Sequence, residues 1–338
     1  MQANSKPLLA ITMGDPAGTG AEIIAKAMAS NSLQNIANIV CVGHAELMQR
    51  AFAIIKQPYT IRAIQQPDQA DFAPGVLNVV HIDTPGIEQL QPGIVQASAG
   101  HAAYEYVSHA IRLALRNAID GVVTSALNKE ALHLAGHNYD GHTEIFAVQT
   151  ASRNVVMMLA SGDFRVVHVS THCALRQAIE LVKPERIMQV LRLTHSSLQH
   201  MGIHNPRLAV AGLNPHSGEG GLFGREEIEY IQPAIEQARA EGFNVSPQPE
   251  PPDTVFVRMQ QFKEFDAVVA QYHDQGHIAA KIVDFWGGVN ITLGLPIIRT
   301  SVDHGTAFNI VGTGKARSDS LINAVQYAQL MAKNRVTE

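Results

Sequence analysis

The chain has 338 residues, of which 46% are hydrophobic and 16% are charged, and its formal net charge is −5. A length above about 250–300 residues favours two lobes over a single core. The negative charge excludes the electrostatic footprint of a nucleic-acid-binding or membrane-surface protein, and no apolar run reaches the roughly 18 residues of a membrane span. We therefore expect a globular protein without nucleic-acid or membrane partners.

Strand-like runs alternate with helical patterns along the chain, which predicts βαβ units and a mostly parallel sheet. The expected strands lie at residues 8–13, 39–42, 121–125, 157–160, 166–170, 267–271, 289–293 and 297–300. The expected helices lie at about residues 21–29, 97–117, 129–134, 184–201, 225–240 and 320–333, with another ending near residue 54. Residues 58–93, rich in Pro, Gln and Asp, predict short edge strands and loops. No linker separates the lobes, so we expect the chain to cross between them more than once.

The N-terminal residues lack the basic, apolar and cleavage segments of a signal peptide. Cys41 and Cys173 lie far apart and in no paired spacing, which is typical of reduced thiols in a cytosolic enzyme. We expect a cytoplasmic location. The 16 histidines are an unusually high number and favour a search for metal or acid–base chemistry.

Residues 14–20 (GDPAGTG) form a glycine-rich turn between the first strand and the first helix. Backbone amides at a helix N-terminus could hold an anion there. The turn is not a Rossmann fingerprint, because Ile23 stands where the third Gly or Ala belongs, and no Gly-Lys-Ser/Thr closes it as in a P-loop. A tight structural turn is an equally good interpretation.

Three strand-like runs end in a histidine, namely His172, His216 and His273. Open α/β sheets bind their ligands at the carboxyl ends of strands. Three neutral imidazoles with an open position make a catalytic divalent-metal site, typically zinc, that polarises a substrate oxygen. Each histidine alone could equally be a hydrogen-bonded structural residue. Asp274 could orient a metal ligand or act as a base.

Two further segments carry side chains suited to an anionic substrate. His142 and Thr143 could bind a polar substrate, although Thr143 could instead cap the following helix. Lys281, Asn290 and Arg299 stand in a charge-poor stretch and could clamp a phosphate or carboxylate, the Arg by a bidentate fork and the Lys as a point charge. Lys281 could also be an ordinary solvated side chain.

Together these segments resemble the 4-hydroxythreonine-4-phosphate dehydrogenase family of vitamin B6 biosynthesis (the PdxA family). The matching motifs are TMGDPAG at residues 12–18, GHTE at 141–144, TH at 171–172, NPHSGEGG at 214–221, YHDQG at 272–276, GVNITLGLP at 288–296 and RTSVDHGT at 299–306. The resemblance covers nearly the whole chain. It implies an α/β, isocitrate/isopropylmalate dehydrogenase-like fold with two interleaved α/β lobes and a central cleft. We expect a nucleotide-binding lobe of residues 1–130 plus 285–338 and a metal and dimerisation lobe of residues 131–284.

By position, the resemblance also implies roles for individual residues. The divalent metal would be zinc, or else cobalt, magnesium, manganese or nickel, and its ligands would be His172, His216 and His273. In a homodimer, His273 would come from the partner subunit. The catalytic residues would be His273, Asp274 and Lys281. The phosphorylated substrate would contact His142, Thr143, Lys281, Asn290 and Arg299. NAD or NADP would contact Asp303, His304, Gly305 and Asn309, within a glycine-rich stretch suited to an adenosine moiety.

The implied reaction oxidises the C3 hydroxyl of 4-phosphooxy-L-threonine with NAD(P) and releases CO2 to give 3-amino-2-oxopropyl phosphate, a step of pyridoxine biosynthesis. Three segments, HVSTH at 168–172, HIAAK at 277–281 and AFN at 307–309, look closer to a sister branch that acts on D-threonate or D-erythronate 4-phosphate. Two alternatives belong to other classes. A phosphate acyltransferase-like enzyme has no use for converging histidines, and a non-catalytic ligand-binding protein would form no NADH.

Overall fold

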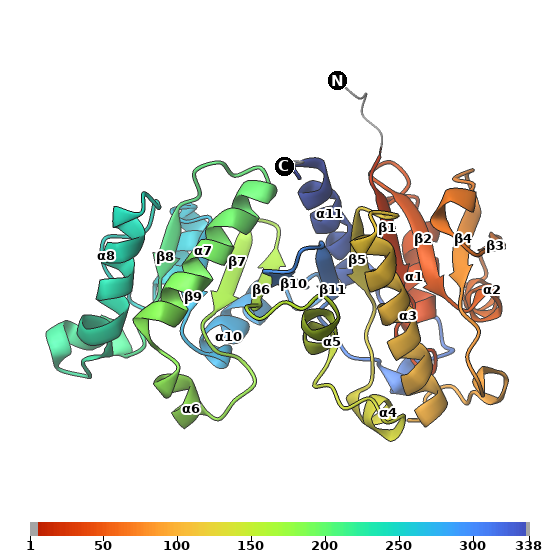
Figure 1. The fold of residues 1–338 in the computed structure, drawn as a ribbon, viewed down its shortest axis with the longest axis horizontal. Coiled ribbons are helices and arrows are strands. Elements are labelled where there is room, and N and C mark those ends of the chain that lie inside the picture. The colour runs from red at the N-terminus through yellow and green to blue at the C-terminus, as the bar shows by residue number, and fades with distance from the viewer. Residues whose placement is uncertain (1–5, 336–338) are drawn as a thin grey trace. The chain divides into compact units, whose positions relative to one another are not determined.

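The computed structural model describes residues 6–335 as two compact units (Figure 1). Within that range, unit 1 comprises residues 6–153 and Leu295–Lys333, and unit 2 comprises Asn154–Gly294 with residues 334–335. The chain therefore leaves unit 1 and re-enters it, as interleaved lobes require. Both crossings lie further along the chain than the boundaries expected after residues 130 and 284.

Unit 1 is built on parallel strands in the order β3-β4-β2-β1-β5-β11. Their bounds are β1 (Leu8–Thr12), β2 (Asn38–Gly43), β3 (Thr60–Ile64), β4 (Val76–His81), β5 (Gly121–Thr124) and β11 (Arg299–Val302). The expectation that residues 58–93 supply only edge strands is wrong for β4, which pairs with both β2 and β3. Val79 and Val80 are fully buried, as an internal parallel strand requires.

Six α-helices accompany this sheet. They are α1 (Gly20–Ala29), α2 (Ala45–Ile54), α3 (Ala97–Leu115), α4 (Lys129–Leu134), α5 (His142–Gln149) and α11 (Asp319–Lys333). The sequence pattern predicts that one face of α3 consists of Ala103, Val107, Ile111, Ala114 and Leu115. The first four are buried, whereas Leu115, the last residue of the helix, is 45% exposed. α3 and α4 meet backbone to backbone, because a Cβ on Gly100 would lie 2.0 Å from the Ala131 carbonyl oxygen.

Unit 2 has a mixed sheet rather than a parallel one, with the order β10-β6-β7-β9-β8. Its strands are β6 (Val156–Ser161), β7 (Phe164–His168), β8 (Leu208–Val210), β9 (Ala267–Ala270) and β10 (Val289–Leu293). β6 runs antiparallel to β10 and β7, whereas β7, β9 and β8 are parallel to one another. Val166 and Val268 belong to a core on which Ala279 and Val283 pack.

The helices of unit 2 are α6 (Leu175–Glu180), α7 (Pro184–His200), α8 (Gln232–Ala240), α9 (Val255–Val257) and α10 (His273–Val283). The helix expected at residues 225–240 opens with a wide π-turn, Glu227–Ile231. Pro233, near the start of α8, lacks the N–H of a regular ladder. Cys41 and Cys173 are both free thiols, as expected. Within residues 6–335, no helix is both long and apolar enough to cross a membrane.

Candidate active site

The three histidines predicted as metal ligands follow three neighbouring parallel strands of unit 2. β7, β9 and β8 lie side by side, so their carboxyl ends share one edge of the sheet. β7 ends at His168, and His172 therefore lies in the loop beyond it. His216 lies in the turn after β8, and His273 is the first residue of α10 after β9.

His172 and His273 lie close together within one chain. Their ring centroids are 5.7 Å apart, and both line a pocket of about 530 Å³ together with Tyr272 and Asp274. His216 is not part of this pocket, and its Nδ1 lies 3.5 Å from an Asp253 carboxylate oxygen. Within residues 6–335, the three predicted ligands do not form a group whose ligand atoms all lie within 4.8 Å of one another. A single chain therefore brings two of the three ligands together.

The contact between His273 and Asp274 determines which ring nitrogen can bind a metal. The Nδ1 of His273 lies 2.7 Å from Oδ1 of Asp274. A carboxylate oxygen accepts and does not donate, so Nδ1 carries the hydrogen and Nε2 keeps its lone pair. Imidazoles that bind metals usually donate their second N–H to a carboxylate in this way. The donor set of the pocket thus fits a divalent metal, with Asp274 orienting the ligand.

The turn that carries His216 has an unusual backbone. His216, Ser217 and Glu219 adopt φ values of 50°, 56° and 46°, with Gly218 and Gly220 in the same left-handed region. Each non-glycine residue there costs about 1–2 kcal/mol. Such strain persists only where the surroundings fix it, and it clusters at functional sites.

The buried side chain of Glu227 holds this turn in place. Its Oε1 accepts the N–H groups of Leu213 and Asn214 at 2.7 Å each, and its Oε2 accepts the Asn214 side-chain amide at 3.0 Å. A buried carboxylate with these charge-assisted hydrogen bonds can offset part of the backbone strain. Glu227 was not predicted as a site residue, and only the contacts of the folded chain identify it.

A second layer of histidines packs behind His273. The ring of His277, one turn along α10, stacks on the His273 ring with centroids 3.6 Å apart and planes inclined by 12°. Nδ1 of His277 lies 3.1 Å from Nε2 of His168. His168 is 1% exposed, and burial, followed by the nearby His277, lowers its pKa to about 3. His168 is therefore a neutral ring at physiological pH.

His142 and Arg299, predicted to contact the phosphorylated substrate, lie together in unit 1. Arg299 is 3% exposed, donates to the Thr124 hydroxyl at 3.0 Å and has its guanidinium carbon 5.7 Å from the Phe146 ring centroid. Burial lowers the pKa of Arg299 to about 9, so it stays cationic at neutral pH. Burial, and then the charge of Arg299, lowers the pKa of His142 well below its usual value. Within the described chain, Nε2 of His142 is enclosed and has no hydrogen-bond partner.

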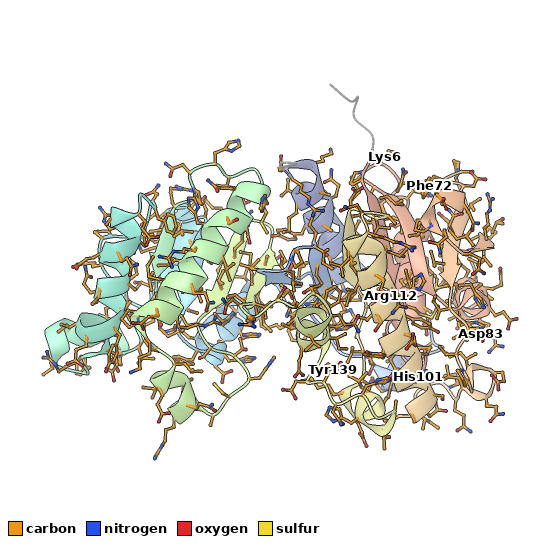
Figure 2. All side chains as sticks on the ribbon, in the orientation of Figure 1. Lys6, Phe72, Asp83, His101, Arg112 and Tyr139 are labelled. Carbon is orange, nitrogen blue, oxygen red and sulfur yellow. The ribbon has the colours of Figure 1, made fainter. Side chains whose placement is uncertain are left out.

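The interpretation of Thr143 as a helix cap is wrong. α5 begins at His142 after Gly141, and no side chain caps it. The loop before α5 is instead fixed by Glu144, whose carboxylate accepts the Asp140 N–H at 2.6 Å. Before this loop, His137 stacks on the ring of Tyr104 of α3, with ring centroids 3.8 Å apart. His101 also stacks on His137, and Tyr139 on Tyr104; both are labelled in Figure 2.

The other predicted substrate contacts, Lys281 and Asn290, belong to unit 2. Lys281 lies in the last turn of α10, half-buried, with Nζ 5.5 Å from the Phe285 ring centroid. Asn290 is half-buried on β10, in register with Leu159.

The residues predicted to contact the nucleotide lie in a loop that packs on the glycine-rich turn. His304, Gly305 and Asn309 are exposed and Asp303 is half-buried. The Thr306 carbonyl accepts the Thr19 N–H at 3.0 Å, so the two segments are joined through their backbones. Within residues 6–335, and apart from Gly305 itself and its two chain neighbours, no heavy atom lies within 4 Å of the position of a Cβ on Gly305.

The glycine-rich turn is a tight structural turn, in agreement with one of its two interpretations. A Cβ on Gly14 would lie 2.3 Å from the Ala126 carbonyl oxygen, and one on Gly20 would lie 2.1 Å from that of Met13. Asp15 accepts the Ala17 N–H at 2.8 Å, and burial raises the pKa of Asp15 to about 6. A carboxylate in this position disfavours a bound anion.

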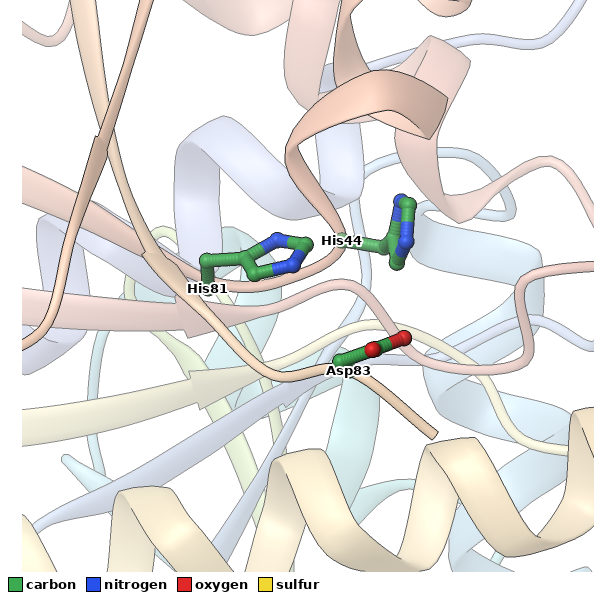
Figure 3. Close-up of side chains that lie close together, drawn as sticks. All are labelled: His44, His81 and Asp83. Atoms are coloured by element: carbon green, nitrogen blue, oxygen red, sulfur yellow. The ribbon is translucent and has the colours of Figure 1, made fainter. Parts of the chain in front are cut away.

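One cluster of possible metal ligands in unit 1 was not predicted (Figure 3). Within residues 6–335, the ligand atoms of His44, His81 and Asp83 all lie within 4.8 Å of one another. However, the Ala45 N–H donates to Nδ1 of His81 at 3.1 Å, which leaves the hydrogen of a neutral ring on Nε2. His81 thus acts as a cap for α2, which has no cap from its own N-cap side chain. The sequence signal for this cluster is weak: His44 follows β2, and His81 ends the neighbouring strand β4.

Comparisons with known proteins identify the family and the fold of the chain. A profile of the family described as "Pyridoxal phosphate biosynthetic protein PdxA" matches residues 35–328. The chain is 48% identical over 325 residues to a D-threonate 4-phosphate dehydrogenase of Salmonella typhimurium, covering 96% of this chain and 98% of the relative. It is 48% identical to a 4-hydroxythreonine-4-phosphate dehydrogenase of Beijerinckia indica, with coverages of 95% and 94%. A crystal structure of a 4-hydroxythreonine-4-phosphate dehydrogenase from Klebsiella pneumoniae superposes with a TM-score of 0.88 at 45% identity, covering 97% of this chain and 100% of that one.

Proposed function

The chain belongs to the PdxA family of dehydrogenases, and we propose that it is a divalent-metal-dependent, NAD(P)-linked oxidoreductase that oxidises and decarboxylates a 4-phosphorylated hydroxy acid. The observation that carries the metal requirement is the contact of Asp274 with Nδ1 of His273, which leaves Nε2 of that ring available as a ligand. His172 would be a second ligand, from the same edge of the sheet. His216 would complete the ligand set, and a partner subunit would supply His273. When bound, the metal would polarise the C3 oxygen of the substrate and NAD(P) would accept the hydride.

Charge supports a phosphorylated substrate. Arg299 offers a buried guanidinium, and the neutral ring of His142 can donate a hydrogen bond without adding a second charge. Arg recognises phosphate by a bidentate fork, and Lys281 would add a point charge. We assign Thr143 and Asn290 to the same substrate as neutral hydrogen-bonding groups. Asp274 is engaged with His273, so we assign it to orientation, with Lys281 as the candidate acid or base.

Two substrates share this chemistry and differ at C2, which carries an amino group in 4-phosphooxy-L-threonine and a hydroxyl group in D-threonate 4-phosphate. Oxidation at C3 makes either one a β-keto acid, and loss of CO2 leaves a three-carbon ketone phosphate. The segments at residues 168–172, 277–281 and 307–309 support D-threonate or D-erythronate 4-phosphate, as does the similarity to the Salmonella enzyme. The Beijerinckia enzyme supports 4-phosphooxy-L-threonine and a role in pyridoxine biosynthesis.

The proposed NAD(P) contact is the loop that contains Asp303, His304, Gly305 and Asn309. Three of these residues are exposed and Asp303 is half-buried, so their hydrogen-bonding groups are accessible to a nucleotide. We also propose that the protein is a homodimer and that it acts in the cytoplasm. An apolar surface on unit 2 supports the homodimer. Ile278, Ile282 and Trp286 are 57%, 80% and 57% exposed, beside a pocket of about 720 Å³ that Ile278 and Ile282 line. Exposed apolar patches of this kind mark protein interfaces.

The test is NADH and NADPH formation with 4-phosphooxy-L-threonine, D-threonate 4-phosphate and D-erythronate 4-phosphate, before and after chelation and re-addition of Zn²⁺ or Co²⁺. Unphosphorylated D-threonate is the matched substrate control, and Arg299→Lys is the matched variant, which keeps the charge but loses the fork. We expect metal-dependent turnover with at least one phosphate ester and a higher KM in Arg299→Lys. Turnover that survives complete metal removal would exclude the metal role, and absence of turnover with all three esters would favour an acyltransferase-like or non-catalytic protein.

A further inference from the structure

His168, which is buried, and His277, which is half-buried, form an imidazole pair that the proposed reaction does not use. The carbonyl oxygen of His273 lies 3.1 Å from Nδ1 of His277. Because a carbonyl oxygen only accepts, Nδ1 of His277 carries the hydrogen. The same nitrogen lies 3.1 Å from Nε2 of His168, which must then be the acceptor. The His277 ring is therefore held at one edge by its own helix and by β7.

Close packing between α10 and β7 permits this contact. A Cβ on Gly276 would lie 2.3 Å from Nε2 of His168 and 2.6 Å from a methyl carbon of Val166. Only a glycine lets the helix approach the buried ring so closely. A leucine at position 168 would fill a comparable space without the desolvation of a polar ring. The retained imidazole thus points to a role that an apolar side chain does not supply.

Two contacts restrict the ring of His273. The His277 ring covers the face of the His273 ring, 3.6 Å away and nearly parallel, while Asp274 binds its Nδ1 edge at 2.7 Å. One contact restricts the ring plane and the other restricts rotation and the tautomer. A metal ligand must be held within about 10–20° of its productive geometry.

We propose that His168 and His277 are positioning residues for His273: His168 holds His277, and the His277 ring holds the plane in which His273 presents Nε2 to a divalent metal. This inference rests on the proposed function, since it assumes that His273 is a metal ligand. It adds two residues that touch neither substrate nor metal.

The test is Co²⁺ binding to the metal-free, full-length protein. Calorimetry measures the Kd and the stoichiometry, and the visible absorption of the bound ion reports its coordination. His277→Leu is expected to raise the Kd for Co²⁺ by about 10–100-fold, as is usual when a residue that orients a ligand is lost. His168→Leu is expected to raise it less, because it acts through His277. The stoichiometry should not change. Thermal unfolding of the metal-free variants is measured in parallel.

Two further variants separate stacking from hydrogen bonding and serve if His277→Leu does not fold. His277→Phe keeps a flat ring but no donor, and His277→Asn keeps a donor near the Nδ1 position but no ring face. Each should recover part of the lost affinity. His195→Leu is the matched control, since His195 also stacks on an aromatic ring, that of Phe243 at 4.5 Å, but outside this cluster. Its Kd should equal that of the unaltered protein.

An unchanged Kd in folded His277→Leu would overturn the positioning role, and so would equal losses in His277→Leu and His195→Leu. Failure of the proposed function looks different. In that case the unaltered protein would not bind Co²⁺, or His172→Ala would bind it as tightly as the unaltered protein.

Discussion

Two clusters of this molecule each contain two histidines and one aspartate, but they differ in the hydrogen-bond partner of one histidine nitrogen. In unit 1, His44 follows β2, and the neighbouring strand β4 ends at His81, with Asp83 just beyond it. In unit 2, His172 follows β7, and His273 and Asp274 follow the neighbouring strand β9. At His273 a carboxylate accepts the Nδ1 hydrogen, whereas at His81 a backbone amide donates to Nδ1. The first arrangement leaves a lone pair on Nε2, and the second leaves a hydrogen there. The partner of Nδ1, rather than the number of histidines, determines which ring nitrogen of a neutral imidazole has the lone pair that a metal needs.

The most direct test of the difference between the two clusters is to remove one histidine from each. His273→Ala is expected to lower kcat/KM by at least about 10²–10³-fold, because the several kcal/mol of charge stabilisation that a metal provides would be lost. His81→Ala is expected to leave kcat/KM unchanged. The measurement is steady-state NADH formation with the best of the three phosphate esters. Equal losses in the two variants would make the clusters functionally equivalent and the comparison wrong.

The sequence predicts the edge of the sheet but not the contacts there. His172, His216 and His273 could be placed at one edge because apolar runs precede them and parallel strands end together. The pairing of His168 with His277 spans 109 residues, and no local pattern specifies it. The polar composition around β4 concealed an internal strand, since its neighbours in the sheet are set by packing of the whole chain.

The turn at His216 and the tautomer of His273 were beyond prediction for related reasons. Three non-glycine residues in a left-handed run contradict local preference, and contacts such as those of Glu227 hold them there. A tautomer depends on the partner of one nitrogen atom, and that partner is known only once the chain is folded.

Asp15 is a carboxylate that, unlike Asp274, contacts a backbone N–H and not an imidazole. Its folded pKa of about 6 lies above the ordinary 3.8, so the folded state binds a proton more tightly than the unfolded state does. The contribution of Asp15 to stability is therefore most favourable below about pH 4, becomes less favourable as the pH rises to about 6, and above that stays lower by about 3 kcal/mol.

Asp15→Asn should remove this dependence. Urea denaturation at pH 8 is expected to show a more stable variant, by up to about 3 kcal/mol, with a smaller difference near pH 4. Asp274→Asn is the control carboxylate variant, expected to show no comparable gain at pH 8. A constant difference between Asp15→Asn and the unaltered protein at both pH values would contradict the assignment.

Asp274→Asn tests the tautomer argument directly. An amide can donate to Nδ1 of His273, as the Ala45 N–H donates to His81, and it would then move the ring hydrogen to Nε2. We expect Co²⁺ affinity to fall by about 10–100-fold. Asp274→Glu, which keeps an accepting carboxylate, should lose less. Undiminished affinity in Asp274→Asn would show that the carboxylate does not select the tautomer.

The smallest effect is expected at His81, where the role is structural. His81→Ala leaves the first N–H of α2 without its acceptor, and the loss of a helix cap costs about 1 kcal/mol. Urea denaturation should show this loss. His304→Ala, which removes an exposed ring whose Nδ1 lies 2.9 Å from the adjacent Gly305 carbonyl oxygen, should not. The decisive measurement is Co²⁺ stoichiometry: if His81→Ala lost one equivalent of metal, the cluster of unit 1 would be a metal site, and the Ala45 hydrogen bond would have to break when the ion binds. An unchanged stoichiometry together with lower stability would support the conclusion that the two clusters differ in the position of the ring hydrogen, which lies on Nδ1 in His273 and on Nε2 in His81.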